Sequence, residues 1–207
     1  MTDAISRALL ELGAATLGES GGRPMQASIK AAWPGAVLAA PAFPVRCTPG
    51  DNLAIHDAVA CAPFGSALVV DVGTRRELGY WGEVLTTGAE ARGLTGLVID
   101  GCVRDAAALV AHRFPVFSTG LALPGATKEL PGSVGRSTIA GGVEVRLGDW
   151  VVGDVDGVTV VPGDELEQVL AAGKARAEKE AGMFAQLRDG ATTVELLSLD
   201  ATAIEQA

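Results

Sequence analysis

Apolar residues along the chain fall into short continuous runs that alternate with helically spaced sets. Two runs, Ser66–Val72 and Leu97–Ile99, have the composition of strands that are buried on both faces. Between them, Gly82–Arg92 carries apolar residues at a helical spacing. A strand, a helix and a strand in this order predict a parallel βαβ unit with a right-handed crossover.

The same kind of pattern continues over the rest of the chain and predicts an α/β fold. Gly120–Thr138 is rich in Gly, Pro, Ser and Thr and predicts a long loop. Met1–Leu17 shows an amphipathic pattern of apolar residues with interspersed acids. Helices are expected over Asn52–Cys61, with Asp51 as its cap, and over Asp105–His112. Further strands, the first two separated by Pro41 and Pro44, are expected at Ala36–Ala40, Val45–Cys47, Val116–Ser118, Val143–Leu147, Trp150–Gly153 and Val158–Val161.

The longest helix is expected over about residues 164–188. Asp164 is the expected N-cap, and Glu167 follows three residues later, as in a capping box. An apolar stripe follows one face, and the other face carries charged residues that include Glu178 and Glu180. A solvated face with charge pairs is the ordinary interpretation. A helix of this length also suits an arm that contacts another subunit.

Composition limits the classes of protein that fit this pattern. At 207 residues, with 48% hydrophobic and 20% charged residues, the chain can bury one sizeable core, so residues 1–207 are expected to form a single domain. The formal net charge of −9 argues against a broad surface for nucleic acid or anionic membrane. Cys47, Cys61 and Cys102 have no metal-ligand spacing, which favours a reducing, cytoplasmic location. Met1–Leu17 lacks the basic start and apolar core of a signal peptide.

The strongest candidate chemistry follows the second buried strand, where Arg104 and Asp105 stand next to each other. Open α/β sheets bind ligands at the C-terminal ends of their strands. Arg104 can grip a substrate carboxylate with two hydrogen bonds, and Asp105 can hold a hard divalent cation beside it. Taken alone, an Arg-Asp dipeptide is more often a surface ion pair, and Asp105 could instead cap the helix that it begins.

A second candidate site lies at the start of the helix over Gly82–Arg92. The unpaired amides of Glu83, Val84 and Leu85 could bind an anion, and Glu83 brings another carboxylate to the same sheet edge. In the ordinary interpretation, Gly82 ends the preceding loop and Glu83 complements the helix dipole. His56, on the preceding helix, is more often a packed or capping residue than a base.

These residues together resemble a known family, which contains the regulator of ribonuclease activity A and the class II 4-hydroxy-4-methyl-2-oxoglutarate/4-carboxy-4-hydroxy-2-oxoadipate aldolases. The resemblance covers most of the chain. It rests on Gly82-Glu83 followed by Arg104-Asp105, and on Pro49–Leu53 and Gly148–Val158, which close on Val160-Val161-Pro162. It implies a single-domain, swivelling β/β/α fold.

The resemblance also implies a pyruvate aldolase mechanism that depends on Mg²⁺ or Mn²⁺. In this family the residue at Asp105 binds the metal, and the residue at Arg104 contacts the carboxylate of the 2-oxo acid. The residue at Glu83 supports metal-bound water, and the amides of Val84 and Leu85 help to hold the substrate. Oxaloacetate decarboxylation is expected as a side activity, because it passes through the same enolate.

Two further implications concern assembly and a departure from the family pattern. Family members form trimers, sometimes paired into hexamers, in which an acidic residue reaches the site from a neighbouring C-terminal helix. Glu180 is the best match, with Glu178 as the competitor. Family aldolases commonly carry an acid three residues after the metal-binding Asp, where this chain has Ala108. Ala108 keeps open the alternative that the protein is a non-catalytic regulator that binds a ribonuclease E-type partner.

Overall fold

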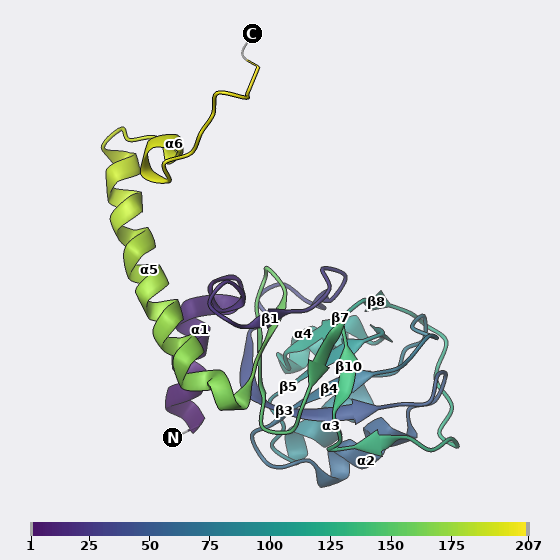
Figure 1. Cartoon of the computed structure of the whole chain (residues 1–207). Coiled ribbons are helices and arrows are strands. Elements are labelled where there is room, and N and C mark those ends of the chain that lie inside the picture. The colour runs from purple at the N-terminus through teal and green to yellow at the C-terminus, as the bar shows by residue number, and fades with distance from the viewer. Residues whose placement is uncertain (1, 206–207) are drawn as a thin grey trace.

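The βαβ unit predicted from the apolar runs lies at the centre of the fold (Figure 1). In the computed structural model, which describes residues 2–205, strand β4 (Ala67–Asp71) pairs in parallel with β5 (Gly96–Asp100), and α3 (Glu83–Ala91) connects them. Strand β5 is buried along its whole length, as expected for a strand that is covered on both faces. The α/β fold class is therefore confirmed.

A mixed nine-stranded sheet extends from this unit in both directions. Its main path runs β1-β13-β12-β3-β4-β5-β7-β2, and β9 pairs with β3. The central strands β3, β4, β5 and β7 are parallel, and the outer strands are antiparallel. The other strands of this sheet are β1 (Arg23–Pro24), β2 (Lys30–Ala31), β3 (Leu38–Arg46), β7 (Val116–Ser118), β9 (Ser133–Val134), β12 (Trp150–Gly153) and β13 (Val158–Val161).

Two small ladders and six helices complete the described chain. The helices other than α3 are α1 (Thr2–Gly18), α2 (Leu53–Cys61), α4 (Ala106–His112), α5 (Leu166–Arg188) and α6 (Thr193–Leu196). The ladders pair β6 (Cys102–Val103) with β8 (Gly120–Leu121), and β10 (Thr138–Ala140) with β11 (Val143–Val145). The loop predicted over Gly120–Thr138 was thus wrong in part, because it contains short strands.

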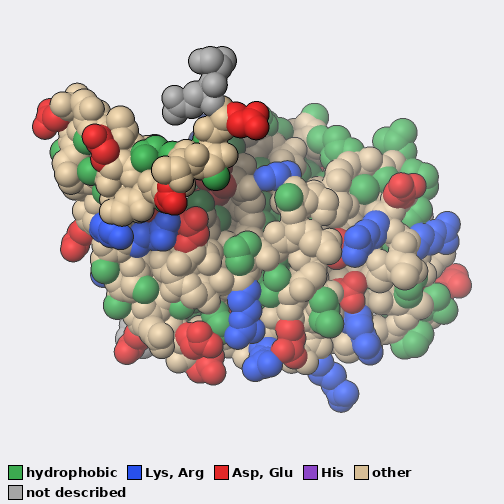
Figure 2. Space-filling model, turned by 45° about the horizontal axis from the view of Figure 1, so that its top comes forward, with side chains coloured by type: hydrophobic (Ala, Val, Ile, Leu, Met, Phe, Trp, Pro, Cys, Tyr) green, Lys and Arg blue, Asp and Glu red, His purple; other side chains and the backbone are tan. Residues whose placement is uncertain are grey.

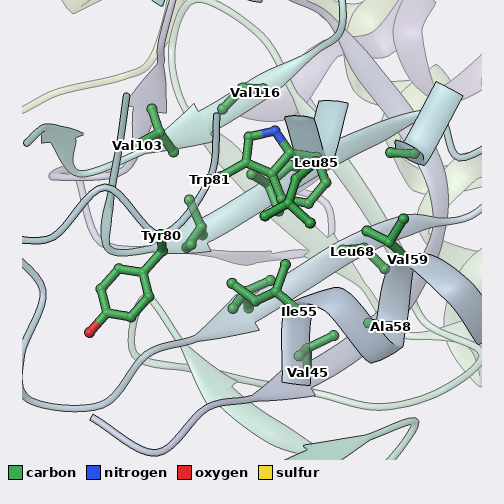
Figure 3. Close-up of a cluster of buried hydrophobic side chains, with 14 of the residues drawn as sticks. Val45, Ile55, Ala58, Val59, Leu68, Tyr80, Trp81, Leu85, Val103 and Val116 are labelled. Atoms are coloured by element: carbon green, nitrogen blue, oxygen red, sulfur yellow. The ribbon is translucent and has the colours of Figure 1, made fainter. Parts of the chain in front are cut away.

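The main hydrophobic core lies between the sheet and helices α2, α3 and α4. Tyr80 and Trp81, which precede α3, are fully buried in it beside Ile55 and Leu68 (Figure 3). Burying such large aromatic side chains removes much apolar surface from water. The loop that leads into α3 is therefore fixed to the core.

The predicted break between two strands at Pro41 and Pro44 was wrong, because β3 is one continuous strand from Leu38 to Arg46. Proline is tolerated where its missing N–H has no ladder partner. The Ala42 amide donates to the carbonyl of Asp149, next to β12. Since alternate N–H groups of a strand point to the same side, an N–H at position 44 would also point to this side. Strand β12 pairs only with Leu38–Pro41, so it offers no partner at Pro44. An N–H at position 41 would point to the other side, towards β4, but pairing with β4 begins one residue later, at Ala42.

The long helix begins later than predicted and leaves the body of the protein. A 3₁₀ turn covers Gly163–Glu165, and α5 starts at Leu166, so the predicted N-cap at Asp164 was wrong. Only Val169 and Gly173 of α5 are buried, and its second half extends away from the sheet together with α6 (Figure 1). The predicted apolar stripe therefore packs on this chain only near its beginning, where α5 meets α1.

Candidate functional site

A pocket lies at the carboxyl edge of the three parallel strands β3, β4 and β5. It encloses about 540 Å³ of empty space, its open mouth included. Each strand contributes through the segment that follows it, as is typical of ligand sites in open α/β sheets. The lining residues are Asn52, His56, Gly79, Tyr80, Trp81, Gly82, Val84, Leu85, Arg104, Asp105, Gly125, Ala126 and Lys128.

Arg104 and Asp105 lie on the wall that follows β5. The Arg104 amide donates to the carbonyl of Trp81 at 2.8 Å, which ties this segment to the loop before α3. The Arg104 Nε and Asp105 Oδ2 atoms are 3.8 Å apart, and both side chains are partly exposed. The pocket thus presents a cation and a carboxylate side by side, as the sequence predicted.

Glycine at position 82 permits this close approach. A Cβ atom there would lie 2.3 Å from Asp105 Oδ2 and 3.1 Å from Arg104 Cγ. Gly79 has a similar role, because a Cβ atom there would lie 2.9 Å from Arg104 Cδ. These two glycines make room for the charged pair.

The first amides of α3 point into the same pocket region. The Glu83 amide donates to Asp105 Oδ2 at 3.1 Å. Among residues 2–205, the amides of Val84 and Leu85 donate to no protein group. Free amides at a helix N-terminus bind anions. The carboxylate of Asp105 does not cap its own helix α4, although Asp105 occupies the N-cap with a left-handed φ of 58°.

A hydrogen-bonded framework holds the loop before α3 in place. Tyr80 Oη accepts from the Gly50 amide at 2.9 Å, and Trp81 Nε1 donates to Thr86 Oγ1 at 2.7 Å. Trp81 also stacks on Phe114, with ring centroids 6.0 Å apart. Well-packed supporting residues of this kind keep a site pre-organised.

Comparison with known proteins identifies the family. The family model described as "RraA-like: Aldolase/RraA" matches residues 2–160. A protein of Halalkalibacterium halodurans named "Putative 4-hydroxy-4-methyl-2-oxoglutarate aldolase" is 37% identical over 142 residues, which are 68% of each chain. This chain belongs to the aldolase/RraA family.

Solved structures of similar fold agree with this assignment. An uncharacterized protein of Pseudomonas syringae superposes with a TM-score of 0.83 at 26% identity, covering 93% of this chain and 92% of that one. A Streptomyces coelicolor protein, described as an unusual member of the RNase ES inhibitor RraA protein family, gives a TM-score of 0.74 at 26% identity, covering 88% and 96%. The RraA-like fold predicted from the sequence is confirmed.

Within this aldolase/RraA chain, Glu83 follows the lining residue Gly82 but does not itself line the pocket, and its side chain faces α4. Its Oε1 atom is 3.8 Å from His112 Nε2, and His112 Nδ1 is 2.7 Å from Glu90 Oε2. Ala108 lies one helical turn before His112 on α4. Ala108, where many family aldolases carry an acid, therefore lies on the same face of α4 as His112, whose imidazole is near Glu83.

Glu180 does not reach the pocket of its own chain, since no residue of α5 lines it. Its Oε1 atom is 2.9 Å from Arg176 Nε, one turn earlier on α5, and Arg176 also pairs with Glu19. Glu178 is exposed on the same helix. A role for either acid in a pocket requires a neighbouring subunit.

The donor set fits a loosely held hard cation. Among residues 2–205, no group of three or more His, Cys, Asp or Glu side chains could enclose a metal ion. Asp105 instead offers one carboxylate at the open pocket, in the space left by the missing side chain of Gly82. Mg²⁺ and Mn²⁺ suit such a site, because they accept one or two carboxylates and take other ligands from water and substrate.

The sequence interpretation assigned no site role to Asn52 or Lys128, and for His56 it favoured a packed or capping role over that of a base; all three residues line the pocket. Asn52 and Lys128 are far apart in sequence, but the backbone amide of Asn52 donates to the carbonyl of Thr127 at 2.9 Å. Together with the hydrogen bonds that Asp51 accepts from the segment 127–130, this contact brings the loop with Lys128 to α2. No local sequence signal predicts these long-range contacts.

Cys102, two residues before Arg104, is buried, and its Sγ atom lies 3.8 Å from Thr119 Oγ1. It does not line the pocket. In Cys47, burial together with the charges of Asp71 and Asp51 raises the pKa to about 12, so that thiol stays protonated.

The outer surface carries charges of both signs (Figure 2). Lys and Arg side chains are interspersed with Asp and Glu over the face shown in Figure 2. No helix within residues 2–205 is both long and apolar enough to cross a membrane.

Proposed function

We propose that this protein is a divalent-metal-dependent aldolase that cleaves a 4-hydroxy-2-oxo acid, such as 4-hydroxy-4-methyl-2-oxoglutarate, to pyruvate and a second 2-oxo acid. One observation carries the proposal: Arg104 and Asp105 share a pocket wall with the free amides of Val84 and Leu85. A 2-oxo carboxylate needs such a combination of fixed positive charge and hydrogen-bond donors. The similarity to the Halalkalibacterium halodurans protein supports the same reaction class.

The substrate would bind through its 2-oxo acid end. The Arg104 guanidinium donates two parallel hydrogen bonds to the carboxylate, a geometry that lysine cannot reproduce. The amides of Val84 and Leu85 donate to the same end of the substrate, aided by the dipole of α3. Asp105 would hold Mg²⁺ or Mn²⁺, which when bound supplies electron withdrawal from the 2-oxo group.

The bond between C3 and C4 breaks when the C4 hydroxyl loses its proton. The electron pair of that bond moves to C3, which gives the enolate of pyruvate and leaves a carbonyl at C4. Donors fixed at the developing negative charge lower the barrier, because they need no reorganisation during the reaction. Glu83 is our candidate to assist the removal of the hydroxyl proton and its return to C3, with Glu180 of a neighbouring subunit in support. Loss of CO₂ from oxaloacetate yields the same enolate and is the expected side reaction.

Exchange of the pyruvate methyl protons with solvent tests the proposal without the natural substrate. We expect NMR in D₂O to show exchange with Mg²⁺ or Mn²⁺, its loss with chelator, and inhibition by oxalate, which resembles the planar enolate. Oxaloacetate decarboxylation, corrected for the rate with metal alone, should respond in the same way. Arg104→Lys should slow both reactions by about a hundredfold.

Failure of both reactions in metal-loaded, assembled protein would refute the aldolase proposal. The second candidate is then a non-catalytic regulator that binds a ribonuclease E-type enzyme. Two observations favour it as the runner-up: Ala108 replaces the acid common in family aldolases, and the similar Streptomyces coelicolor protein is described as a member of the RNase ES inhibitor RraA family.

A further inference from the structure

The pocket has a second flank that the proposed enolate chemistry does not use. Strand β4 lies between β3 and β5 in the sheet. The segment after β5 supplies Arg104 and Asp105, whereas the segment after β3 supplies Asn52 and His56 at the start of α2. These two pairs therefore lie on different sides of the loop that leads from β4 into α3. Lys128, on the loop that pairs with Asn52, adds a cation to the α2 flank.

Asn52 presents a buried hydrogen-bond acceptor without a partner. The residue is 5% exposed, and its Nδ2 atom donates to the carbonyl of Tyr80 at 2.8 Å. This bond fixes the orientation of the amide. Within residues 2–205, Oδ1 has no hydrogen-bond partner. A buried acceptor left unpaired costs about 1–3 kcal/mol, so its place in a pocket lining points to a donor on a ligand.

His56 and Lys128 give the same flank a neutral ring and a cation. His56 Nε2 is buried and likewise has no partner within the described chain. Burial, followed by the nearby charge of Lys128, lowers the pKa of His56, and Asp51 opposes this change. Lys128 forms no ion pair with residues 2–205, and its Nζ atom reaches only the carbonyl of Ala126, at 3.5 Å.

We propose that this α2 flank, formed by Asn52, His56 and Lys128, binds the half of the substrate that leaves as the second product, and that it selects a hydroxy acid. The substrate hydroxyl donates to Asn52 Oδ1, and a carboxylate on C4 accepts from Lys128 Nζ. His56 Nε2 lies beside them and can donate to the same carboxylate. This assignment rests on the proposed aldolase function, which places the 2-oxo acid end at Arg104.

Equilibrium binding to metal-free protein tests the assignment without turnover. The probes are 4-hydroxy-2-oxoglutarate and 4-hydroxy-2-oxopentanoate, which differ only in a carboxylate or a methyl group on C4. NMR titration should show that wild-type protein prefers the carboxylate probe. Lys128→Ala should lower this preference by about tenfold, because a charge-assisted hydrogen bond is lost. The control Arg136→Ala removes an exposed cation outside the pocket lining and should keep the preference.

A third probe tests the hydroxyl contact in the wild-type protein, where no variant can misfold. 2-Oxoglutarate has the same two carboxylates as 4-hydroxy-2-oxoglutarate but no hydroxyl, so it should bind more weakly. Equal binding of the carboxylate and methyl probes to wild type, or an unchanged preference in Lys128→Ala, would overturn the inference. Pyruvate proton exchange is then measured on the same protein after Mg²⁺ has been added. A selective protein that shows no exchange with Mg²⁺ refutes the aldolase proposal, and an exchanging protein without selectivity refutes only the α2-flank assignment.

Discussion

Replacement of Asp51 by Asn should destabilise the protein in a way that depends on pH. Asp51 is 1% exposed. Its Oδ1 atom accepts from the Leu53 amide at 2.8 Å, and its Oδ2 atom accepts from Thr127 Oγ1 at 2.7 Å and from the amides of Glu129 and Leu130 at 2.6 and 3.1 Å. An Asn side chain has one carbonyl oxygen, so its NH₂ group would face donors at one of these two positions.

The magnitude follows from the pKa of the carboxyl group. Burial raises the pKa of Asp51, but the hydrogen bonds from Glu129, Leu53, Thr127 and Leu130 outweigh this effect and lower the pKa from 3.8 to about 2. At about 1.4 kcal/mol per pH unit, this change corresponds to about 2 kcal/mol of stability. Because the folded-state pKa is the lower one, the contribution is complete above the unfolded-state value, falls to about half near pH 3, and is lost below pH 2.

Urea denaturation at pH 7, 4 and 3 measures this contribution. Asp51→Asn should lower the free energy of unfolding by about 2–3 kcal/mol at pH 7, and the difference from wild type should shrink as the pH falls to 3. The control Asp57→Asn alters an exposed acid on α2 and should change stability by less than about 0.5 kcal/mol. A difference between Asp51→Asn and wild type that is equal at pH 7 and pH 3 would show that the carboxylate charge is not what the hydrogen bonds stabilise.

Three further experiments test the site and its assembly. Gly82→Ala should leave the melting temperature almost unchanged, because the Asp105 side chain can move, but it should lower pyruvate proton exchange about tenfold. The control Gly88→Ala lies on α3, where the nearest atom to the added Cβ is 3.4 Å away, and it should lower neither quantity. Mixing inactive Asp105→Ala subunits with inactive Glu180→Ala subunits should restore part of the activity if Glu180 acts across a subunit boundary. A mixture that is as inactive as its two components would exclude shared sites. Ala108→Asp should raise the oxaloacetate decarboxylation rate several-fold by adding a carboxylate one turn from Asp105, and an equal or lower rate would show that the missing acid does not limit catalysis.

Local signals in the sequence predicted the elements that their own residues determine. The apolar runs of β4 and β5 and the helical spacing of α3 led to the correct central unit. Arg104 and Asp105 were placed at the correct sheet edge, because a strand end and the residues after it are contiguous in sequence. Signals of this kind need no knowledge of distant partners.

Features that depend on distant partners could not be predicted in this way. Pro41 and Pro44 indicated a break, but strand β3 continues because the missing N–H of each proline would point to the side on which no strand pairs with that residue. Asp51 was predicted to cap α2 and does bond to Leu53, whereas its three other hydrogen bonds reach the segment 127–130. The α2 flank depends on those contacts, so the sequence indicated only the parts of the pocket that follow β4 and β5.

Under the proposed function, the order of the parallel strands would divide the roles within the pocket. Strand β4 leads to the amides at the start of α3, at the centre of the site, and β5 leads to Arg104 and Asp105, which would bind the 2-oxo acid end. Strand β3 leads to Asn52, whose backbone amide donates to Thr127 on the loop with Lys128. The half that forms the enolate and the half that selects the second product would thus follow different strands. Substitutions on the α2 flank could then change the accepted substrate while Arg104 and Asp105 retain their contacts. We therefore expect family members to differ more in their second product than in their ability to form the pyruvate enolate.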